Sequence, residues 1–243
     1  MEASITFKTV GKTVGKQTLL ADLSFGIEKE STFVIIGENG SGKSMILKLL
    51  VGLIQKDTGT IYIHGQDIST RSLETRSICG YMPQTVNLDE DITVFDNISI
   101  HGQLHGLTPS DAKKNTLHWA DLLNISESLN KYPSKLAYGL QRKILFARTL
   151  VHDPEVLLLD EPTAGMSPNE TTESIQLINN IAESRSLTLL FTEHDMSVVF
   201  GIADRISVLH HGQILASGSP DDVRNDSEVR KVYLGEGLDD ASA

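Results

Sequence analysis

The sequence has few of the residues that cross-link a fold through disulfides, and it lacks the long apolar runs that span a membrane. It has one cysteine, one tryptophan and 5% aromatic residues among 243 positions. Cys79 alone cannot form an internal disulfide, so we expect a reducing, cytosolic environment. No apolar run reaches the ~18–20 residues of a membrane span. The first residues also lack the basic and apolar segments of a signal peptide.

Positive charge is scarce as well. The chain has 21 Lys and Arg against 32 Asp and Glu, a formal net charge of −11. A nucleic-acid-binding protein would need a basic face or stripe, so we expect no nucleic-acid partner. The one basic run contains no acid, and its members are Lys131, Lys135, Arg142, Lys143 and Arg148. A solvated helix face would look the same, but we expect part of this charge to assist anion binding.

Short apolar strands alternate with helical patterns along most of the chain, which indicates an α/β fold with a mainly parallel sheet covered by helices. Residues 1–70 contain short strands and glycines, and we expect an antiparallel β part there with a hairpin near Gly15. Expected strands are Phe33–Ile36, Val156–Leu159, Leu187–Phe191 and Arg205–Leu209. Expected helices are Leu140–Leu150, Pro168–Ala182 and Pro220–Tyr233.

Residues 89–135 change character, and we predict a helical insertion there. One predicted helical face carries Val94, Ile98, Ile100 and Leu104, and another carries Leu117, Ala120 and Leu123. The predicted core then comprises residues 1–88 and 136–243, with a frayed acidic tail at 236–243.

Residues 37–44 fit the pattern G-x-x-x-x-G-K-[ST] between a predicted strand and a predicted helix. The members are Gly37, Glu38, Asn39, Gly40, Ser41, Gly42, Lys43 and Ser44. Backbone N–H groups and a helix N-terminus can surround a phosphate in such a loop. We expect Lys43 to reach the β- and γ-phosphates of a nucleotide and Ser44 to bind Mg²⁺. A glycine-rich turn with a surface lysine is the plainer alternative, but the context favours a P-loop NTPase.

The apolar strand at 156–159 ends in Asp160 and Glu161. Carboxylates at the carboxyl end of a parallel strand lie where ligands bind in such sheets. We expect Asp160 to hold Mg²⁺ through a water and Glu161 to orient or activate the attacking water. Taken alone, the segment could also be a pair of solvated acids.

With these motifs in order, nearly the whole chain resembles the nucleotide-binding subunit of ABC transporters. Gln84, in Tyr81-Met82-Pro83-Gln84, is similar to the residue of that family that senses Mg²⁺ and the water. His194 follows a strand as the family's γ-phosphate-contacting histidine does. The resemblance implies ATP and Mg²⁺ as ligands. It also implies catalytic roles for Lys43, Gln84, Glu161 and His194, and metal contacts for Ser44, Gln84 and Asp160.

The closer likeness is divided. Segments 160–168, 192–196 and 218–236 resemble the ATPases of branched-chain amino-acid importers and of lipopolysaccharide transport. The middle, residues 91–107, is more similar to ATPases of drug and polysaccharide export. The substrate therefore stays unassigned, between amino-acid import and export of a lipid, drug or polysaccharide.

Three positions depart from the family pattern. The signature Leu-Ser-Gly-Gly-Gln reads Leu136-Ala137-Tyr138-Gly139-Leu140, so the serine hydroxyl that the family offers to ATP on the opposite subunit is missing. Ala137, Tyr138 and Gly139 remain the expected nucleotide contacts here. Val14 stands where the family stacks an aromatic ring on adenine, and Ser167 stands at the D-loop aspartate. Ser167 either caps a helix or alters communication between two sites.

The resemblance implies an ATP-hydrolysing, energy-coupling subunit of a membrane transporter. Two such subunits would close head to tail as a homodimer or heterodimer, bound to an integral membrane partner at the cytoplasmic face of the inner or plasma membrane. A soluble ABC-type ATPase outside transport is one alternative. A nucleotide-binding regulator with weak turnover is another, which Ala137 keeps open and the retained Glu161 and His194 oppose.

Overall fold

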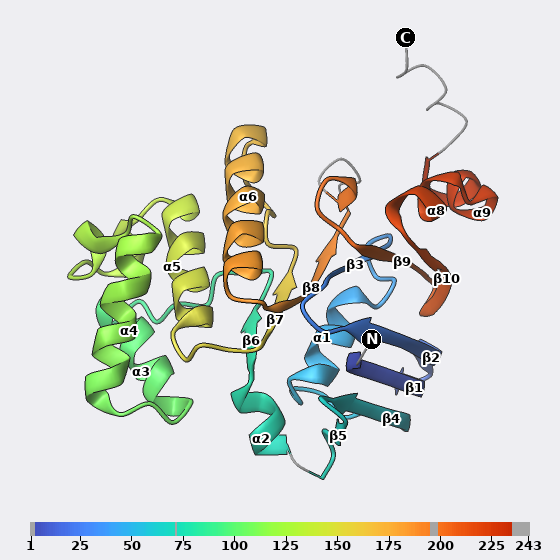
Figure 1. The fold of residues 1–243 in the computed structure, drawn as a ribbon, viewed down its shortest axis with the longest axis horizontal. Coiled ribbons are helices and arrows are strands. Elements are labelled where there is room, and N and C mark those ends of the chain that lie inside the picture. The colour runs from blue at the N-terminus through green and yellow to red at the C-terminus, as the bar shows by residue number, and fades with distance from the viewer. Residues whose placement is uncertain (1–2, 71, 195–198, 235–243) are drawn as a thin grey trace.

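The computed structural model describes residues 3–70, 72–194 and 199–234. The predicted tail at 236–243 and Asp195 lie outside these ranges. Figure 1 shows a central sheet, a smaller sheet toward one end of the molecule, and a group of helices toward the other. The fold is thus α/β, with an antiparallel sheet, a mostly parallel sheet and a helical insertion, as predicted.

The central sheet has six strands in the order β10-β9-β3-β8-β7-β6. Neighbours pair in parallel except β10, which runs antiparallel to β9. Every residue of β3, β7 and β8 is buried, as expected for strands covered on both faces. Their bounds are β3 Thr32–Ile36, β6 Cys79–Met82, β7 Val156–Asp160, β8 Thr188–Glu193, β9 Arg205–His210 and β10 Gln213–Gly218.

The second sheet is antiparallel, with order β2-β1-β4-β5. Its bounds are β1 Ala3–Val14, β2 Gln17–Glu28, β4 Thr58–Ile63 and β5 Gln66–Asp67. The predicted hairpin joins β1 to β2, with Val14 opposite Gln17. Phe7 stacks on Phe25 with ring centroids 4.5 Å apart, and Phe25 stacks on Phe33 of β3 at 5.6 Å. This three-ring stack joins the two sheets.

The central sheet separates two hydrophobic cores, because side chains of a strand alternate between its faces. Val34 and Ile36 of β3 pack in one core with residues of α5 (Tyr138–Leu150), α6 (Pro168–Ser184) and the helical insertion. Phe33 and Ile35 pack in the other with α1 (Lys43–Leu50) and the antiparallel sheet. Helices α1 and α5 therefore lie on opposite faces of one sheet.

The helices around the sheet are α1 Lys43–Leu50, α2 Ser72–Ser77, α5 Tyr138–Leu150, α6 Pro168–Ser184, α8 Pro220–Asn225 and α9 Ser227–Val229, followed by a π-helical turn Arg230–Leu234. Helix α5 starts two residues before its predicted beginning at Leu140. The terminal helix predicted around 220–233 is present but interrupted at Asp226. Asp226 adopts an extended conformation there, and its carboxylate caps the backbone N–H groups of Glu228 and Val229.

The helical insertion contains α3 Val94–Leu104, α4 Pro109–Leu122 and 3₁₀ turns at Ser126–Ser128 and Pro133–Lys135. The predicted apolar face of α3 was partly wrong, because Ile100 and Leu104 are 44% and 80% exposed. Positions 94, 98, 101 and 105 share one side of a 3.6-residue helix, so the buried face continues from Ile98 into histidines. Leu117 of α4 is likewise exposed, whereas Ala120 and Leu123 are buried. None of the helices in the described ranges combines the length and apolarity of a membrane span.

Two glycines with the same backbone angle offer a matched test of the β1–β4 contact. Gly59 and Gly65 both have φ +74°, but a Cβ on Gly59 would lie 2.3 Å from the carbonyl oxygen of Thr9, whereas a Cβ on Gly65 meets no atom within 4 Å. Gly65→Ala should cost only the left-handed backbone penalty, about 1–2 kcal/mol. Gly59→Ala should cost about 1–3 kcal/mol more, because β1 must move away. Urea unfolding of both variants measures the difference, and equal losses would contradict the predicted clash.

Candidate nucleotide-binding site

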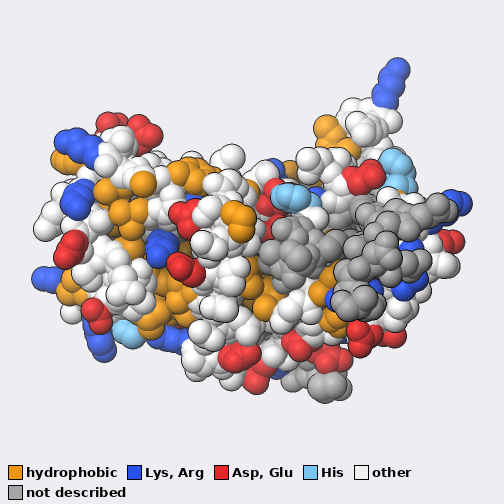
Figure 2. Space-filling model, turned by 90° about the horizontal axis from the view of Figure 1, so that it is seen from above, with side chains coloured by type: hydrophobic (Ala, Val, Ile, Leu, Met, Phe, Trp, Pro, Cys, Tyr) orange, Lys and Arg blue, Asp and Glu red, His pale blue; other side chains and the backbone are white. Residues whose placement is uncertain are grey.

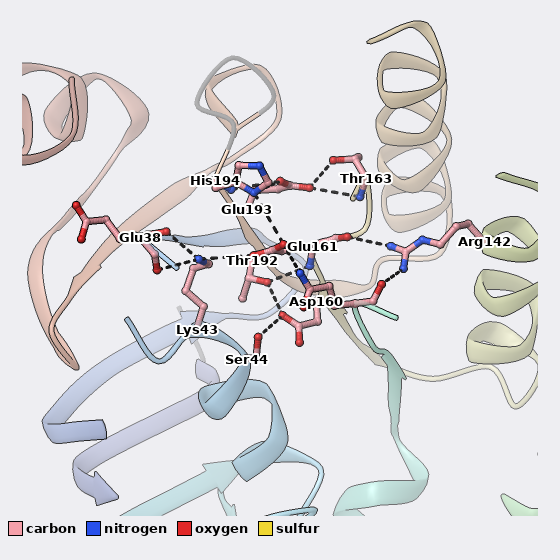
Figure 3. A network of polar contacts seen from close by, with 12 residues as sticks. Glu38, Lys43, Ser44, Arg142, Asp160, Glu161, Thr163, Thr192, Glu193 and His194 are labelled. Carbon is pink, nitrogen blue, oxygen red and sulfur yellow. Dashed lines mark hydrogen bonds and ion pairs between the residues drawn. The ribbon is translucent and has the colours of Figure 1, made fainter. Parts of the chain in front are cut away.

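Four strand ends bring the predicted site residues to one edge of the central sheet. The phosphate loop follows β3, Gln84 follows β6, and His194 follows β8, while Asp160 is the last residue of β7. The register pairs Asp160 with Thr192 across β7 and β8. Since these strands are parallel, their carboxyl ends meet, and Figure 3 shows the resulting polar network.

The phosphate loop is held close to neighbouring strands at its glycines. A Cβ on Gly37 would lie 2.4 Å from the carbonyl oxygen of Leu209 in β9. Gly42 has φ +109°, and a Cβ there would lie 2.7 Å from the Leu20 side chain of β2. Helix α1 begins directly after Gly42, with no side-chain cap and no acid in its first turn. Its first N–H groups thus favour an anion.

The loop residues fit a nucleotide phosphate. Lys43 is buried, and its Nζ donates to the carbonyl oxygens of Gly37 at 2.7 Å and Glu38 at 3.3 Å. Its Nζ lies 3.7 Å from Glu161 Oε1. The buried Ser41 Oγ makes no hydrogen bond with any described residue. A buried hydroxyl without a partner is costly, so Ser41 indicates a polar ligand inside this loop.

Oxygen atoms suited to Mg²⁺ meet beside Lys43. Ser44 Oγ donates to Asp160 Oδ1 at 2.9 Å, and Thr192 Oγ1 donates to the same oxygen at 2.8 Å. Hydroxyl and carboxylate oxygens are the ligands that Mg²⁺ takes in nucleotide sites. Ser44 and Asp160 therefore fit the predicted metal contacts. Thr192 orients Asp160, and none of the sequence motifs pointed to this role.

Glu161 holds an unusual backbone conformation, with φ +45°. Its N–H donates to the Oγ1 of Thr192 at 3.0 Å, and its carbonyl oxygen accepts from Arg142 at 2.9 Å. The Glu161 carboxylate accepts from Gln84 Nε2 at 2.7 Å and lies 3.9 Å from His194 Nδ1. A non-glycine residue with positive φ persists only where surroundings hold it, and such residues cluster at functional sites.

Arg142 is the main functional candidate that the motifs did not single out. It belongs to α5, is 1% exposed, and donates to the carbonyl oxygens of Pro83 at 3.3 Å, Gln84 at 2.5 Å and Glu161 at 2.9 Å. Burial lowers the pKa of its guanidinium. The only sequence signal was its place in the basic run.

That placement corrects the interpretation of the basic run. Arg142 is committed to three carbonyl oxygens, and Arg148 donates to the carbonyl and side chain of Asn87. These two charges therefore hold the Gln84 loop instead of forming a free anion-attracting surface. Lys143 is exposed, and Lys135 lies over the ring of Tyr132 at 5.7 Å.

Glu193 was also missed, because strand-end acids are common. Its buried carboxylate accepts from Thr163 Oγ1 at 2.6 Å and from the backbone N–H of His194 at 3.3 Å. Desolvation raises the pKa of Glu193. It ties β8 to the turn after Glu161, and the side chain of His194, 60% exposed, extends outward from that point.

The signature residues lie at the start of α5, where Tyr138 interacts with Arg142 and its ring would lie 3.3 Å from a Cβ on Gly165. Figure 1 shows α5 on the side of β7 and α6 opposite to α1. Ala137 is the N-cap of α5 and supplies no side-chain hydrogen bond, and Tyr138 is exposed. Val14 is exposed at the hairpin end of β1. These three predicted nucleotide contacts are thus available to a second molecule, and the chain does not bring Ala137 and Tyr138 to its own phosphate loop.

Ser167 forms the predicted capping box. Its N–H and Oγ both donate to Glu170 Oε2, at 2.9 and 2.7 Å, directly before Pro168 begins α6. The same hydrogen bonds lower the pKa of Glu170. Gly139 lies beside Glu170, whose Oε1 would be 3.1 Å from a Cβ at that position. The Ser167–Glu170 capping box therefore lies next to Gly139 of the signature.

The family model "ABC transporter" matches residues 20–164, which include the phosphate loop and the Asp160–Glu161 pair. The chain belongs to the ABC transporter ATP-binding family. A second model, "Branched-chain amino acid ATP-binding cassette transporter", matches residues 213–239. Proteins of this family bind ATP, usually with Mg²⁺.

Curated relatives include importers and exporters, in agreement with the divided resemblance. LivG of Escherichia coli K12, a high-affinity branched-chain amino acid transport ATP-binding protein, is 37% identical over 83% of this chain and 86% of its own. LptB of Haemophilus influenzae, a lipopolysaccharide export system ATP-binding protein, is 30% identical over 96% and 97%. Nod factor export ATP-binding protein I of Paraburkholderia xenovorans is 32% identical over 90% and 72%.

Solved structures agree on the fold. A nucleotide-free ATP-binding cassette from an ABC transporter superposes with a TM-score of 0.83 at 23% identity, covering 97% of this chain and all of that one. The cbiO1 subunit from Clostridium perfringens has a TM-score of 0.83 at 24% identity and covers 96% of both chains. These likenesses confirm the α/β P-loop architecture.

Replacement of Arg142 tests its bridging role. Arg142→Lys keeps the charge but cannot reach three carbonyl oxygens, so we expect about 1.5–3 kcal/mol lower free energy of unfolding for each unsatisfied bond to the charged group, reduced where water replaces it. Urea unfolding checks this expectation. Lys143→Ala, on the exposed side of the same helix, is the control and should change stability by under about 0.5 kcal/mol. Equal effects of the two substitutions would contradict the bridge.

Proposed function

We propose that the protein is an ATP-hydrolysing, energy-coupling subunit of a membrane transporter. The convergence of Lys43, Asp160, Glu161, Gln84 and His194 at four neighbouring strand ends carries this proposal. A protein that only bound nucleotide would not need Glu161 and Gln84 at 2.7 Å beside a buried lysine.

The chain's residues would divide the work of hydrolysis. The phosphate loop binds and orients the triphosphate, and Lys43 neutralises charge on the β- and γ-phosphates. Ser44 and Asp160 would hold Mg²⁺, which supplies further charge neutralisation at the phosphates. Glu161 accepts a proton from the attacking water, while Gln84 and His194 orient Glu161 and the γ-phosphate. Positioning of the water and the triphosphate, together with neutralisation of the phosphate charge, would thus supply most of the rate enhancement of hydrolysis.

The position of the signature supports a second nucleotide-binding subunit. The N-terminus of α5 lies apart from the chain's own phosphate loop, so its exposed N–H groups are free to face ATP on a partner in a head-to-tail dimer. Ala137 removes one hydroxyl from that contact, worth about 1.5–3 kcal/mol in a bond to a charged group. We therefore infer a heterodimer with unequal sites, or a homodimer with slow turnover.

A membrane partner would dock at the helical insertion, residues 89–135, with the rest of the chain as ATP-binding core. Among the described residues, most exposed large apolar side chains lie in this insertion, and Figure 2 shows hydrophobic side chains over that half of the face in view. They are Ile100, Leu104, Leu117, Leu122 and Tyr132. The subunit would then be peripheral, at the cytoplasmic face of the inner or plasma membrane.

Arg142 connects such docking to the site. It joins the signature helix to the Gln84 loop and to Glu161, so movement of the insertion reaches both partners of the 2.7 Å contact. The relatives act in amino-acid import and in export of lipopolysaccharide or Nod factor, and this chain's substrate belongs to the same broad range. A nucleotide-binding regulator with weak turnover is the second candidate, which Ala137 favours.

Loss of the proposed base should separate hydrolysis from binding. Glu161→Gln keeps an oxygen acceptor for Gln84 but cannot take a proton, so phosphate release should fall about 10²- to 10⁴-fold while binding of a fluorescent ATP analogue persists. Glu173→Gln, an exposed acid on α6, is the control. Unchanged phosphate release in Glu161→Gln would refute the catalytic assignment.

Ala137→Ser separates a capping effect from a contact across the dimer. A serine N-cap should raise the free energy of unfolding of α5 and its surroundings by about 0.5–2 kcal/mol, whatever the oligomeric state. In a homodimer it should also accelerate hydrolysis by roughly tenfold to a hundredfold, through the restored bond to the γ-phosphate. Denaturant unfolding and phosphate release are the two measurements. If the variant is a more stable homodimer but hydrolyses ATP at an unaltered rate, the proposed contact between residue 137 and the γ-phosphate on the partner is wrong.

A further inference from the structure

Three of the chain's eight histidines meet far from the nucleotide loop. His101 lies on α3, His105 is the C-cap of that helix, and His152 follows α5. One ligand nitrogen from each lies within 4.8 Å of the other two. The centroids of the His105 and His152 rings are 3.9 Å apart, and those of His101 and His105 are 4.6 Å apart.

The packing of α3 explains why the rings meet. His101 and His105 are one turn apart, in the spacing that puts two side chains on one helix face. Gly102 lies between them, and a Cβ there would be 3.3 Å from the Val151 side chain. The glycine lets α3 approach the segment after α5, where His152 follows Val151. The spacing of apolar residues predicted the helix, but it did not predict that His101 and His105 lie beside His152.

The hydrogen bond of His152 leaves one nitrogen available for a ligand. Its Nε2 lies 3.2 Å from the carbonyl oxygen of Cys79, which can only accept, so Nε2 carries the proton. The other nitrogen, Nδ1, is then a lone-pair donor. It is buried and has no hydrogen-bond partner among the described residues. Metal-binding histidines commonly donate their second ring nitrogen to a backbone carbonyl in this way.

The rings are also in the protonation state that a metal needs. Burial lowers the pKa of His101 to about 3 and that of His152 to about 4, and it lowers the pKa of His105 as well. The His101 and His152 imidazoles are therefore neutral near pH 7, and the shift in pKa at His105 favours its neutral form. Neutral imidazole nitrogens are ligands for Zn²⁺ and for neighbouring divalent transition metals.

We propose that His101, His105 and His152 bind a Zn²⁺ ion, with solvent in the fourth position. Zn–N bonds of about 2.0–2.1 Å place tetrahedral ligand atoms about 3.3 Å apart, so the rings must close in by a small rearrangement. A metal lies in the plane of each ligating ring, so the stacked His105 must turn away from His152. His105 is only half-buried, at the C-cap of α3.

The proposed ion would link the helical insertion to the ATP-binding core through shared ligands. His152 is bound to β6 through Cys79, while His101 and His105 belong to α3. The site lies at the opposite end of α5 from Ala137, about 20 Å away for a 13-residue helix. Cys79, the partner of His152, pairs with Val156 at the start of β7, whereas Asp160 ends β7, so the site and the Mg²⁺ contacts lie at opposite ends of these strands. Arg148, whose charge also acts on His101, lowers the affinity relative to an uncharged setting.

Titration of the untagged, full-length, nucleotide-free protein with ZnCl₂ in a calorimeter tests the proposal. We expect one ion per chain, a higher melting temperature with Zn²⁺, and tetrahedral visible bands when Co²⁺ replaces Zn²⁺. His105→Gln should weaken binding at least tenfold and remove the thermal shift. His105 is half-buried, so this variant should fold, and His101→Gln is a second variant with the same expected result.

His118→Gln is the matched control, an exposed histidine on the neighbouring helix α4. It should bind Zn²⁺ like the unaltered protein. If His105→Gln and His101→Gln also bind like the unaltered protein, the ion binds elsewhere, for instance at exposed His194, and the proposal is overturned. Absence of stoichiometric binding by the unaltered protein overturns it as well.

Discussion

A buried guanidinium joins the signature helix α5 to the two loops that carry Gln84 and Glu161. Arg142 extends from α5 and donates to the main chain at Pro83, Gln84 and Glu161. A charge with so little exposure is tolerated only where it is satisfied by strong hydrogen bonds. The strained backbone of Glu161, the position of Gln84 and the orientation of the signature helix all depend on this one side chain, which is itself no part of the reacting network.

The motif residues could be predicted because each motif carries its own context. The glycines, Lys43 and Ser44 lie between a strand and a helix, and Asp160 and Glu161 end an apolar strand, so parallel pairing alone brings them together. Their roles in hydrolysis remain predictions. The capping box at Ser167 was predictable for the same reason, since its partner lies three residues along the chain.

Residues whose partners are distant in sequence could not be predicted this way. Thr192 contacts Asp160 only because β8 pairs with β7, and Arg142 contacts Gln84 across 58 positions. The predicted apolar face of α3 was wrong at Ile100 and Leu104, because hydrophobic spacing considers only apolar residues and leaves out His101 and His105, which are partly buried on the opposite side. Nothing in the sequence indicated a role for Gly102, although the absence of a side chain there lets α3 approach Val151 closely.

The stack of Phe7, Phe25 and Phe33 has a consequence for nucleotide choice. It fastens the hairpin that carries Val14 to the strand that leads into the phosphate loop. Val14, the base contact that the family resemblance implies, lies at the exposed end of this hairpin and takes no part in the stack. We therefore expect an aromatic ring introduced at position 14 to change base preference while both sheets stay intact.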